Sequence, residues 1–286
     1  VAMYGCASGE KSNASEASIL GEVPVDKMTY RTSPKGEHVS LLGYGCMRWP
    51  LKPAPDSDGN VIDQDAVNEL VDYAIAHGVN YFDTSPVYCQ GFSERATGVA
   101  LKRHPRERLL IATKMSNFQN YTRENSIKMY HQSMKELQTD YLDLYIIHRW
   151  DYDTPIEETM EALHDLVKMG KVRYIGASSM HAWQFAKAQF IAEKNGWTKF
   201  VSMQNLYNLL YREEEREMIP LLQDQNVAMT PWSPLAGGRL TRDIGAITAR
   251  ASQAVQADLP AYIVASDNEV ISRVHKLADE RGITRG

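Results

Sequence analysis

Short hydrophobic runs recur about every thirty residues along the chain, and segments of helix length separate them. The runs lie at about 40–45, 79–84, 109–114, 141–147, 172–177, 199–204 and 227–231. Strands that alternate with helices at this spacing form a parallel sheet. No G-x-G-x-x-G motif follows the first run, which favours a closed barrel over a doubly wound sheet. The predicted fold class is α/β, a (β/α)8 TIM barrel.

Apolar residues in the intervening segments repeat with the period of an α-helix. Such faces are present within 67–75, 156–167 and 267–280. Gly78 and Gly170 should end the first two helices. After the third of these segments we find no run for an eighth strand. We therefore expect one barrel domain over 27–286 that lacks the eighth strand and the final helix, which makes the chain a fragment.

The amino-acid composition limits the kinds of molecule that this protein is expected to bind. The chain has 286 residues, 43% hydrophobic and 23% charged, with a net charge of −5. The basic or acidic runs at 103–108 and 212–216 are interpreted as solvated helix ends or faces, so nucleic acid is not an expected partner. Cys6, Cys46 and Cys89 form no C-x-x-C pair, and no metal site is expected. The oligomeric state stays open.

The first 26 residues are rich in Ala, Ser, Gly and Glu and are predicted to be a disordered lead-in. Small residues around Cys6, in YGCAS, are also typical of the end of a bacterial export signal. Two interpretations stay open. The favoured one is a linker in a cytoplasmic protein without a membrane span. The other is the remnant of a lipoprotein or Tat-type signal of an exported protein, with a lipid anchor at Cys6.

Four polar side chains stand at the C-terminal ends of successive runs: Asp83 and Tyr88, Lys114, and His148. In a parallel barrel these ends meet at one mouth, where barrel active sites lie. Singly, the four could be a helix cap, a rim aromatic, a strand-end charge and a core imidazole. Their shared position at strand ends favours a catalytic group.

These residue types suit carbonyl reduction, which needs hydride at carbon and a proton at oxygen. A phenol has a pKa of about 10 and donates its proton poorly unless its ionised form is stabilised. We assign Tyr88 as general acid and Lys114 as the cation that lowers its pKa. Asp83 would keep Lys114 charged and oriented, and His148 would hydrogen-bond and polarise the substrate oxygen.

Seven motifs occur in a fixed order: YFDTSPVY with GFSE, ATK, IIH, GASSM, SMQNLYN and PWSPLAGGRL. Over about 28–286 the chain resembles the aldo-keto reductase family of NADP-dependent oxidoreductase barrels, and the four residues match that family's catalytic tetrad. The first half is similar to a branch that often carries a ferredoxin-like module, but the cluster cysteines are absent. The part from HRWDYDTPIEE onward is similar to soluble aldehyde or sugar reductases.

The resemblance implies NADP(H) across the mouth of the barrel. Its expected contacts are Gly45, Met47, Ser178, Ser179, Gln204, Trp232, Ser233, Pro234, Leu235, Gly237 and Arg239. Ser178, Ser179 and Gln204 offer hydroxyl and amide groups to the nicotinamide carboxamide. Trp232 would stack on the ring, and the SPLAGGRL segment would bind the pyrophosphate through backbone donors and a cation. Family members more often have Ser-Asn at the two serine positions.

Two functions, which belong to different classes of protein, stay open. The first is an NADPH-dependent oxidoreductase that reduces an aldehyde or ketone to an alcohol. The alternative is a sensor or scaffold that binds nicotinamide cofactor with little turnover. The complete tetrad favours the enzyme, whereas lipidation at Cys6 would favour the alternative. The identity of the substrate depends on loops that the motifs do not define.

Overall fold

A parallel sheet of seven strands forms the centre of the molecule in the computed structural model, which describes residues 28–55, 59–116, 120–246 and 265–286. The strands are, in spatial order, β3 (Tyr44–Gly45), β6 (Tyr81–Asp83), β7 (Leu110–Lys114), β8 (Leu142–Ile147), β9 (Val172–Ser178), β10 (Ser202–Gln204) and β11 (Ala228–Met229). Every pair of neighbours is parallel. This confirms the seven predicted strands and their order. The expectations for residues 1–26, including Cys6, fall outside the described residues.

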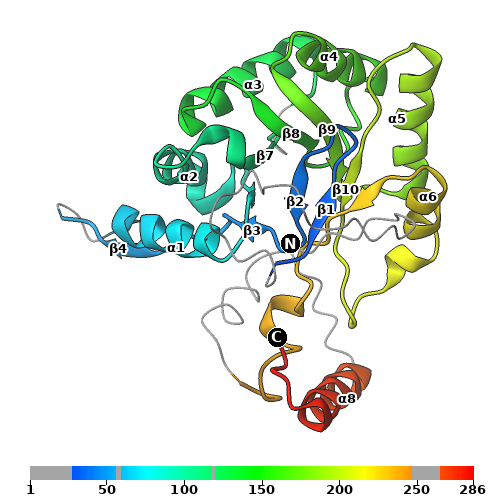
Figure 1. The fold of residues 1–286 in the computed structure, drawn as a ribbon. Coiled ribbons are helices and arrows are strands. Elements are labelled where there is room, and N and C mark those ends of the chain that lie inside the picture. Colours follow the sequence, from blue (N-terminus) through cyan, green and yellow to red (C-terminus); the bar gives the residue numbers. More distant parts are fainter. Residues whose placement is uncertain (1–27, 56–58, 117–119, 247–264) are drawn as a thin grey trace.

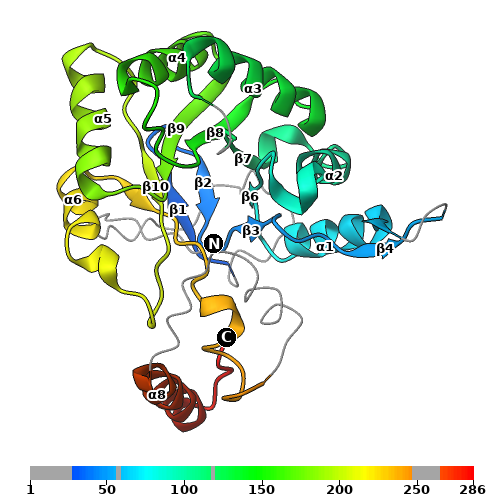
Figure 2. The same cartoon turned by 180° about the vertical axis from the view of Figure 1, so that it is seen from behind.

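All described helices but the last cover the outer side of this sheet. The described α-helices are α1 (Gln64–Ala76), α2 (Ser93–Leu101), α3 (Arg123–Leu137), α4 (Ile156–Lys168), α5 (Ala182–Lys194), α6 (Met218–Asp224) and α8 (Ala265–Arg281). The sheet curls, α1 to α6 follow its outer side, and α8 lies apart from them (Figures 1 and 2). Gly78 and Gly170 follow α1 and α4 with φ values of 88° and 71°, as predicted for helix ends. The result is a (β/α) barrel, of which the described residues supply seven strands.

Two antiparallel hairpins were not predicted. The hairpin of β1 (Tyr30–Thr32) and β2 (His38–Ser40) lies inside the curve of the sheet (Figure 1). It covers the N-terminal ends of the strands, where the amide of Ser40 donates to Oδ1 of Asn80 at 2.8 Å. The second hairpin joins β4 (Leu51–Pro53) to β5 (Asn60–Ile62). The predicted first run, 40–45, therefore contains the end of β2 as well as β3.

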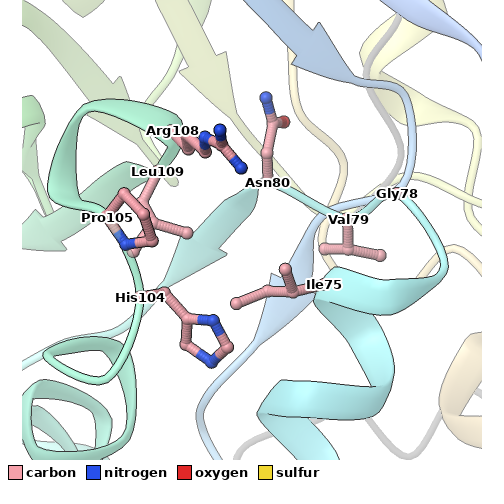
Figure 3. A pocket seen from close by; sticks show the side chains of 8 residues that line it. All are labelled: Ile75, Gly78, Val79, Asn80, His104, Pro105, Arg108 and Leu109. Atoms are coloured by element: carbon pink, nitrogen blue, oxygen red, sulfur yellow. The ribbon is translucent and has the colours of Figure 1, made fainter. Parts of the chain in front are cut away.

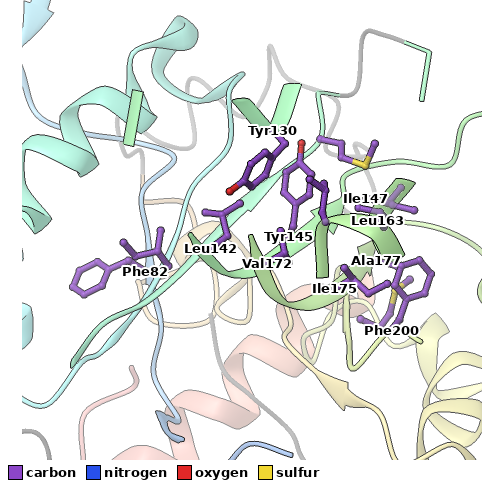
Figure 4. Close-up of a cluster of buried hydrophobic side chains, with 14 of the residues drawn as sticks. Phe82, Tyr130, Leu142, Tyr145, Ile147, Leu163, Val172, Ile175, Ala177 and Phe200 are labelled. Carbon is purple, nitrogen blue, oxygen red and sulfur yellow. The ribbon is translucent and has the colours of Figure 1, made fainter. Parts of the chain in front are cut away.

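Side chains alternate between the two faces of each strand, which divides the core in two. The outer cluster lies between sheet and helices and includes Phe82, Tyr145 and Ile175 (Figure 4). The inner cluster faces the barrel interior and consists of Val39, Tyr81, Leu110, Ala112, Leu144, Ile146 and Tyr174. Positions two residues beyond members of the inner cluster share its face, and these positions carry the candidate site.

Candidate active site

Three of the four predicted catalytic side chains continue the inner rows of the barrel. Asp83 follows Tyr81 on β6, Lys114 follows Ala112 at the end of β7, and His148 stands just beyond β8. All are at the C-terminal ends of parallel strands. The alternation that buries the inner cluster therefore also aims these polar side chains into one end of the barrel.

Asp83 and Lys114 form a buried ion pair. The ammonium Nζ of Lys114 lies 2.5 Å from Oδ1 of Asp83 and 2.9 Å from the carbonyl oxygen of Thr84. The Lys114 side chain has no exposed surface, and Asp83 is 3% exposed. Burial alone lowers the pKa of Lys114, but the charges of Asp83 and Tyr88 outweigh it and raise the pKa above its ordinary value. Lys114 is therefore a permanent cation at neutral pH.

Tyr88 lies over this cation, in the short 3-10 turn Tyr88–Gly91. Nζ of Lys114 is 4.8 Å from the centroid of the phenol ring. Cys89 and Gln90 take left-handed backbone angles, with φ of 49° and 57°, which bends the chain sharply after Tyr88.

The pKa of Tyr88 differs from the prediction. Burial raises it, whereas the charge and hydrogen bond of Lys114 lower it, and the net pKa is raised from 10.0. The prediction of a lowered pKa is thus wrong for the net shift, although the contribution of Lys114 has the predicted sign. Desolvation of the phenolate exceeds the stabilisation that one ammonium supplies. Tyr88 keeps its proton at neutral pH and can donate it.

His148 packs against Tyr88 edge to face. The ring centroids are 5.9 Å apart at an interplanar angle of 84°. Burial, with smaller contributions from the charges of Lys114 and Arg149, lowers the pKa of His148 to about 3. The imidazole is neutral, and its Nδ1 lies 3.3 Å from the hydroxyl of Ser85. When Ser85 donates to Nδ1, the ring proton resides on Nε2, from which it can be donated to a substrate oxygen.

Sequence reasoning missed the other partners of Asp83. Its Oδ2 accepts hydrogen bonds from Nε2 of Gln204 at 2.8 Å and from the hydroxyl of Tyr81 at 3.3 Å. Gln204 was predicted to contact the nicotinamide carboxamide, but its amide nitrogen here donates to the carboxylate of Asp83. The position of Tyr81, two residues before Asp83 on the same strand face, was the available signal.

The two predicted serines lie together at the end of β9. The hydroxyl of Ser178 donates to the carbonyl oxygen of Gln204 at 2.7 Å. Ser179 has a left-handed φ of 51°, and its amide donates to Oδ1 of Asn205 at 2.7 Å. Asn205 is buried and was not predicted; it holds Ser179 in this unusual backbone conformation.

Three further predicted cofactor residues flank the ends of the strands. Gly45 pairs with Asp83 across β3 and β6, which puts its backbone beside the ion pair. Met47 follows β3 and is 50% exposed. Trp232 forms an isolated parallel bridge with Leu206 just beyond β10 and β11. All three lie at the same end of the barrel as the tetrad.

The loop from 232 to 239 contains four residues with left-handed backbone angles. Its left-handed positions are Ser233 with φ 52°, Ala236 with φ 51°, Gly237 with φ 68° and Gly238 with φ 95°. Pro234 and Leu235 lie within the same turn. Ala236, Gly237 and Gly238 are consecutive left-handed residues, and they make the chain turn tightly. The N–H groups of Ala236, Gly238 and Arg239 donate to carbonyl oxygens of the same loop, those of Ser233, Leu235 and Ala236. The loop stays the predicted pyrophosphate-binding segment.

Arg239, the predicted cation of this loop, already has a carboxylate partner. Its guanidinium lies 2.8 Å from Oδ2 of Asp267, near the start of α8. Sequence reasoning did not foresee this ion pair. It ties α8 to the candidate phosphate loop and offsets part of the positive charge there.

A small cavity of about 80 Å³ lies elsewhere (Figure 3). Its lining includes Asn80 and Leu109, which precede β6 and β7, so it opens at the N-terminal ends of the strands. It is not part of the candidate site.

Within the described ranges, no three side chains of His, Cys, Asp or Glu gather in a way that could hold a metal ion. None of the described helices combines the length and apolar character that a bilayer crossing requires.

Comparison with known proteins shows the family of the chain. The sequence pattern of the Aldo/keto reductase family matches residues 41–285. The chain is 42% identical to the aldo-keto reductase AMT2 of Alternaria alternata over 257 residues, 78% of this chain and 70% of that protein. It is 39% identical to the versiconal hemiacetal acetate reductase of Aspergillus parasiticus over 284 residues, 89% of this chain and 81% of that protein.

A third relative is named as a dehydrogenase, and the first two are named as reductases. The putative aryl-alcohol dehydrogenase AAD16 of Saccharomyces cerevisiae is 35% identical over 286 residues, 89% of this chain and 82% of that protein. The chain belongs to the aldo-keto reductase family. Membership, together with these names, indicates an oxidoreductase that acts on small carbonyl or alcohol compounds with a nicotinamide cofactor.

Proposed function

We propose that this protein reduces an aldehyde or ketone to the alcohol with NADPH, and that Tyr88 is the general acid. One observation carries the proposal: at the C-terminal end of the barrel, the buried Lys114 contacts both the carboxylate of Asp83 and the ring of Tyr88, which packs on the neutral His148. A cation, a proton donor and a neutral hydrogen-bond donor thus surround one position at the barrel mouth.

Each side chain has a separate task. NADPH, when bound, would supply the hydride for the carbonyl carbon. His148 donates a hydrogen bond from Nε2 to the carbonyl oxygen and orients the substrate. Tyr88 transfers its phenolic proton to the same oxygen as negative charge develops there. Lys114 stabilises the resulting phenolate, and Asp83 keeps the ammonium in place.

The residues around the mouth would hold NADP(H). Ser178 and Ser179 offer polar groups for the carboxamide, and Trp232 offers a flat surface for the nicotinamide ring. In the 232–239 loop, the N–H groups of Ala236, Gly238 and Arg239 donate within the loop, so those of Ser233, Leu235 and Gly237 would bind the pyrophosphate. Gln204 contributes indirectly by holding Asp83, and the oxygen of its amide can still accept from the carboxamide. The relatives named as reductases support a small carbonyl substrate.

Replacing Tyr88 by Phe tests the assignment. Tyr88→Phe keeps the ring but removes the transferable proton, so kcat for aldehyde reduction should fall by about two to four decades. The Kd for NADPH, from quenching of tryptophan fluorescence, should stay near that of the wild type. Tyr73→Phe, on the exposed side of α1, is the matched control and should be fully active.

The outcomes separate the enzyme from its alternative. If Tyr88→Phe reduces aldehydes as fast as the wild type, Tyr88 is not the acid. If the wild type binds NADPH but turns over none of a panel of aliphatic and aromatic aldehydes, the sensor or scaffold function is the better conclusion.

A further inference from the structure

A second tyrosine lies directly beneath the tetrad. Tyr81 belongs to the inner cluster, is 2% exposed, and points its hydroxyl at Oδ2 of Asp83, 3.3 Å away. The chain makes room for this ring, because a Cβ atom at Gly43 would collide with it. A phenol in an otherwise apolar barrel interior needs a polar partner, and here that partner is the carboxylate of the ion pair.

The Asp83 carboxylate is held from two sides. Lys114 contacts Oδ1, whereas Gln204 and Tyr81 donate to Oδ2. The pKa of Tyr81 is raised well above 10 by burial and by the charge of Asp83. Tyr81 therefore never gives up its proton under working conditions, and its hydroxyl is always a donor to Asp83.

We propose that Tyr81 is a positioning residue for the reduction: its hydroxyl fixes the Asp83 carboxylate so that Lys114 stays directed at Tyr88. The proposal rests on the function argued above. Tyr81 acts through Asp83 and Lys114, and its contacts place it below the ion pair, on the side away from the strand ends.

The hydrogen bond also affects the acid electrostatically. The charge of Asp83 opposes ionisation of Tyr88, and a donor at Oδ2 draws part of that charge away from the site. Without the Tyr81 hydroxyl, Tyr88 becomes harder to ionise and donates its proton less readily. Because reduction requires a protonated Tyr88, the alkaline limb of the pH profile of kcat should then move to higher pH while its plateau falls.

The experiment compares two hydroxyl deletions in the same inner cluster. Tyr81→Phe should lower kcat about tenfold, within the contribution of a hydrogen bond to a charged group, and shift the alkaline limb upward. The KM for the aldehyde and the Kd for NADPH should change less than about twofold. Tyr174→Phe is the control, because the hydroxyl of Tyr174 contacts Ser33 and Glu37 at the opposite end of the barrel.

Several results would overturn the proposal. An unchanged kcat and pH profile in Tyr81→Phe would do so, and so would an equal loss of kcat in Tyr174→Phe, which would indicate general loss of packing. Gly43→Ala provides a second variant if Tyr81→Phe does not fold: it displaces the ring, keeps the hydroxyl, and should also lower kcat and shift the alkaline limb. A Gly43→Ala enzyme with the wild-type profile would reject the idea.

Tyr88→Phe separates this proposal from the proposed function. If Tyr88→Phe remains active, the assignment of the acid fails. If Tyr88→Phe is inactive while Tyr81→Phe behaves as the wild type, the reductase mechanism stands and only the role of Tyr81 is rejected.

Discussion

Lys114 shows how a single buried charge can be tolerated. Its ammonium has no exposed surface, and the carboxylate of Asp83 and the carbonyl oxygen of Thr84 replace the water it has lost. A buried ion pair contributes little net stability over a pair of apolar residues, but removal of one member leaves the other charge unpaired. The pair is therefore best explained by the proposed catalytic function. Once the pair is present, the loss of either member lowers the stability of the fold.

This asymmetry gives a prediction for unfolding. Lys114→Met should reduce the free energy of unfolding by about 3–5 kcal/mol, because Asp83 is left charged and buried. The double variant Asp83→Asn, Lys114→Met should recover a large part of that loss while remaining inactive. Urea unfolding followed by circular dichroism measures both. Lys199→Met, which removes an exposed ion pair with Glu193, is the control and should leave stability unchanged.

Equal stability of the single and double variants would show that Asp83 takes up a proton or moves to water when Lys114 is lost.

The sequence alone could predict those site residues that stand at the ends of strands. Asp83, Lys114 and His148 each follow a hydrophobic run, so local pattern was enough to group them. Contacts across the barrel were not predictable in this way. Gln204 reaches Asp83 from four strands away in the sheet, and that approach depends on strand register and curvature, which no local pattern encodes.

Among the elements, the contact of α2 with α3 depends on one glycine. A Cβ atom at Gly98 would lie 2.5 Å from the carbonyl oxygen of Leu137, so the two helices approach to backbone contact there. Glycine within a helix costs about 0.5–1 kcal/mol relative to alanine. Close packing offsets that cost, because a larger residue would force α3 outward.

We expect the packing effect to exceed the helix propensity. Overpacking a tight site costs about 1–3 kcal/mol, against a gain of up to about 1 kcal/mol from alanine in a helix. Gly98→Ala should therefore lower Tm by a few degrees in a thermal melt. Gly45→Ala, where a Cβ atom meets nothing within 4 Å, should melt like the wild type. A higher Tm for Gly98→Ala would mean that α2 and α3 separate easily.

The elements that belong to the repeating strand–helix pattern were predictable, and the two hairpins outside that pattern were not. The helix predicted from 67–75 is α1, and that predicted from 267–280 is α8, because several turns of apolar spacing identify them. The hairpin strands β1 and β2 have three residues each, too few to show a period. Their pairing is stabilised by contact with the barrel end, such as the bond from Ser40 to Asn80, which is a tertiary effect.

At the scale of the whole molecule, the two ends of the barrel have different tasks. The N-terminal end is closed by the β1–β2 hairpin and by an ion pair of Arg106 with Asp143 at 2.7 Å. Arg106 also lies 3.9 Å from the centre of the Tyr141 ring. The 103–108 run was expected to be solvated, and for Arg106 this was wrong. Charges at this end serve stability, whereas those at the C-terminal end serve the proposed chemistry.

A buried neutral histidine at the catalytic end makes the stability of the whole fold depend on pH. The pKa of His148 is about 3 in the folded protein, against about 6.5 in an unfolded chain. Above pH 6.5 both states are neutral, and His148 adds no pH dependence. Below pH 6.5 the unfolded state binds a proton that the folded state does not, so stability falls as the pH falls toward 3.

The difference between wild type and His148→Asn isolates this effect from the carboxyl groups that titrate in the same range. As the pH falls from 6.5 to 4.5, the wild type should lose stability relative to His148→Asn by about 1 kcal/mol per pH unit, near the limit for one proton. Urea unfolding at a series of pH values measures the difference. Parallel stability curves for the two proteins would show that the imidazole binds its proton equally well in the folded protein and in the unfolded chain. Burial would then not keep the ring neutral below pH 6.5, and the argument that desolvation holds His148 as a neutral donor would fail.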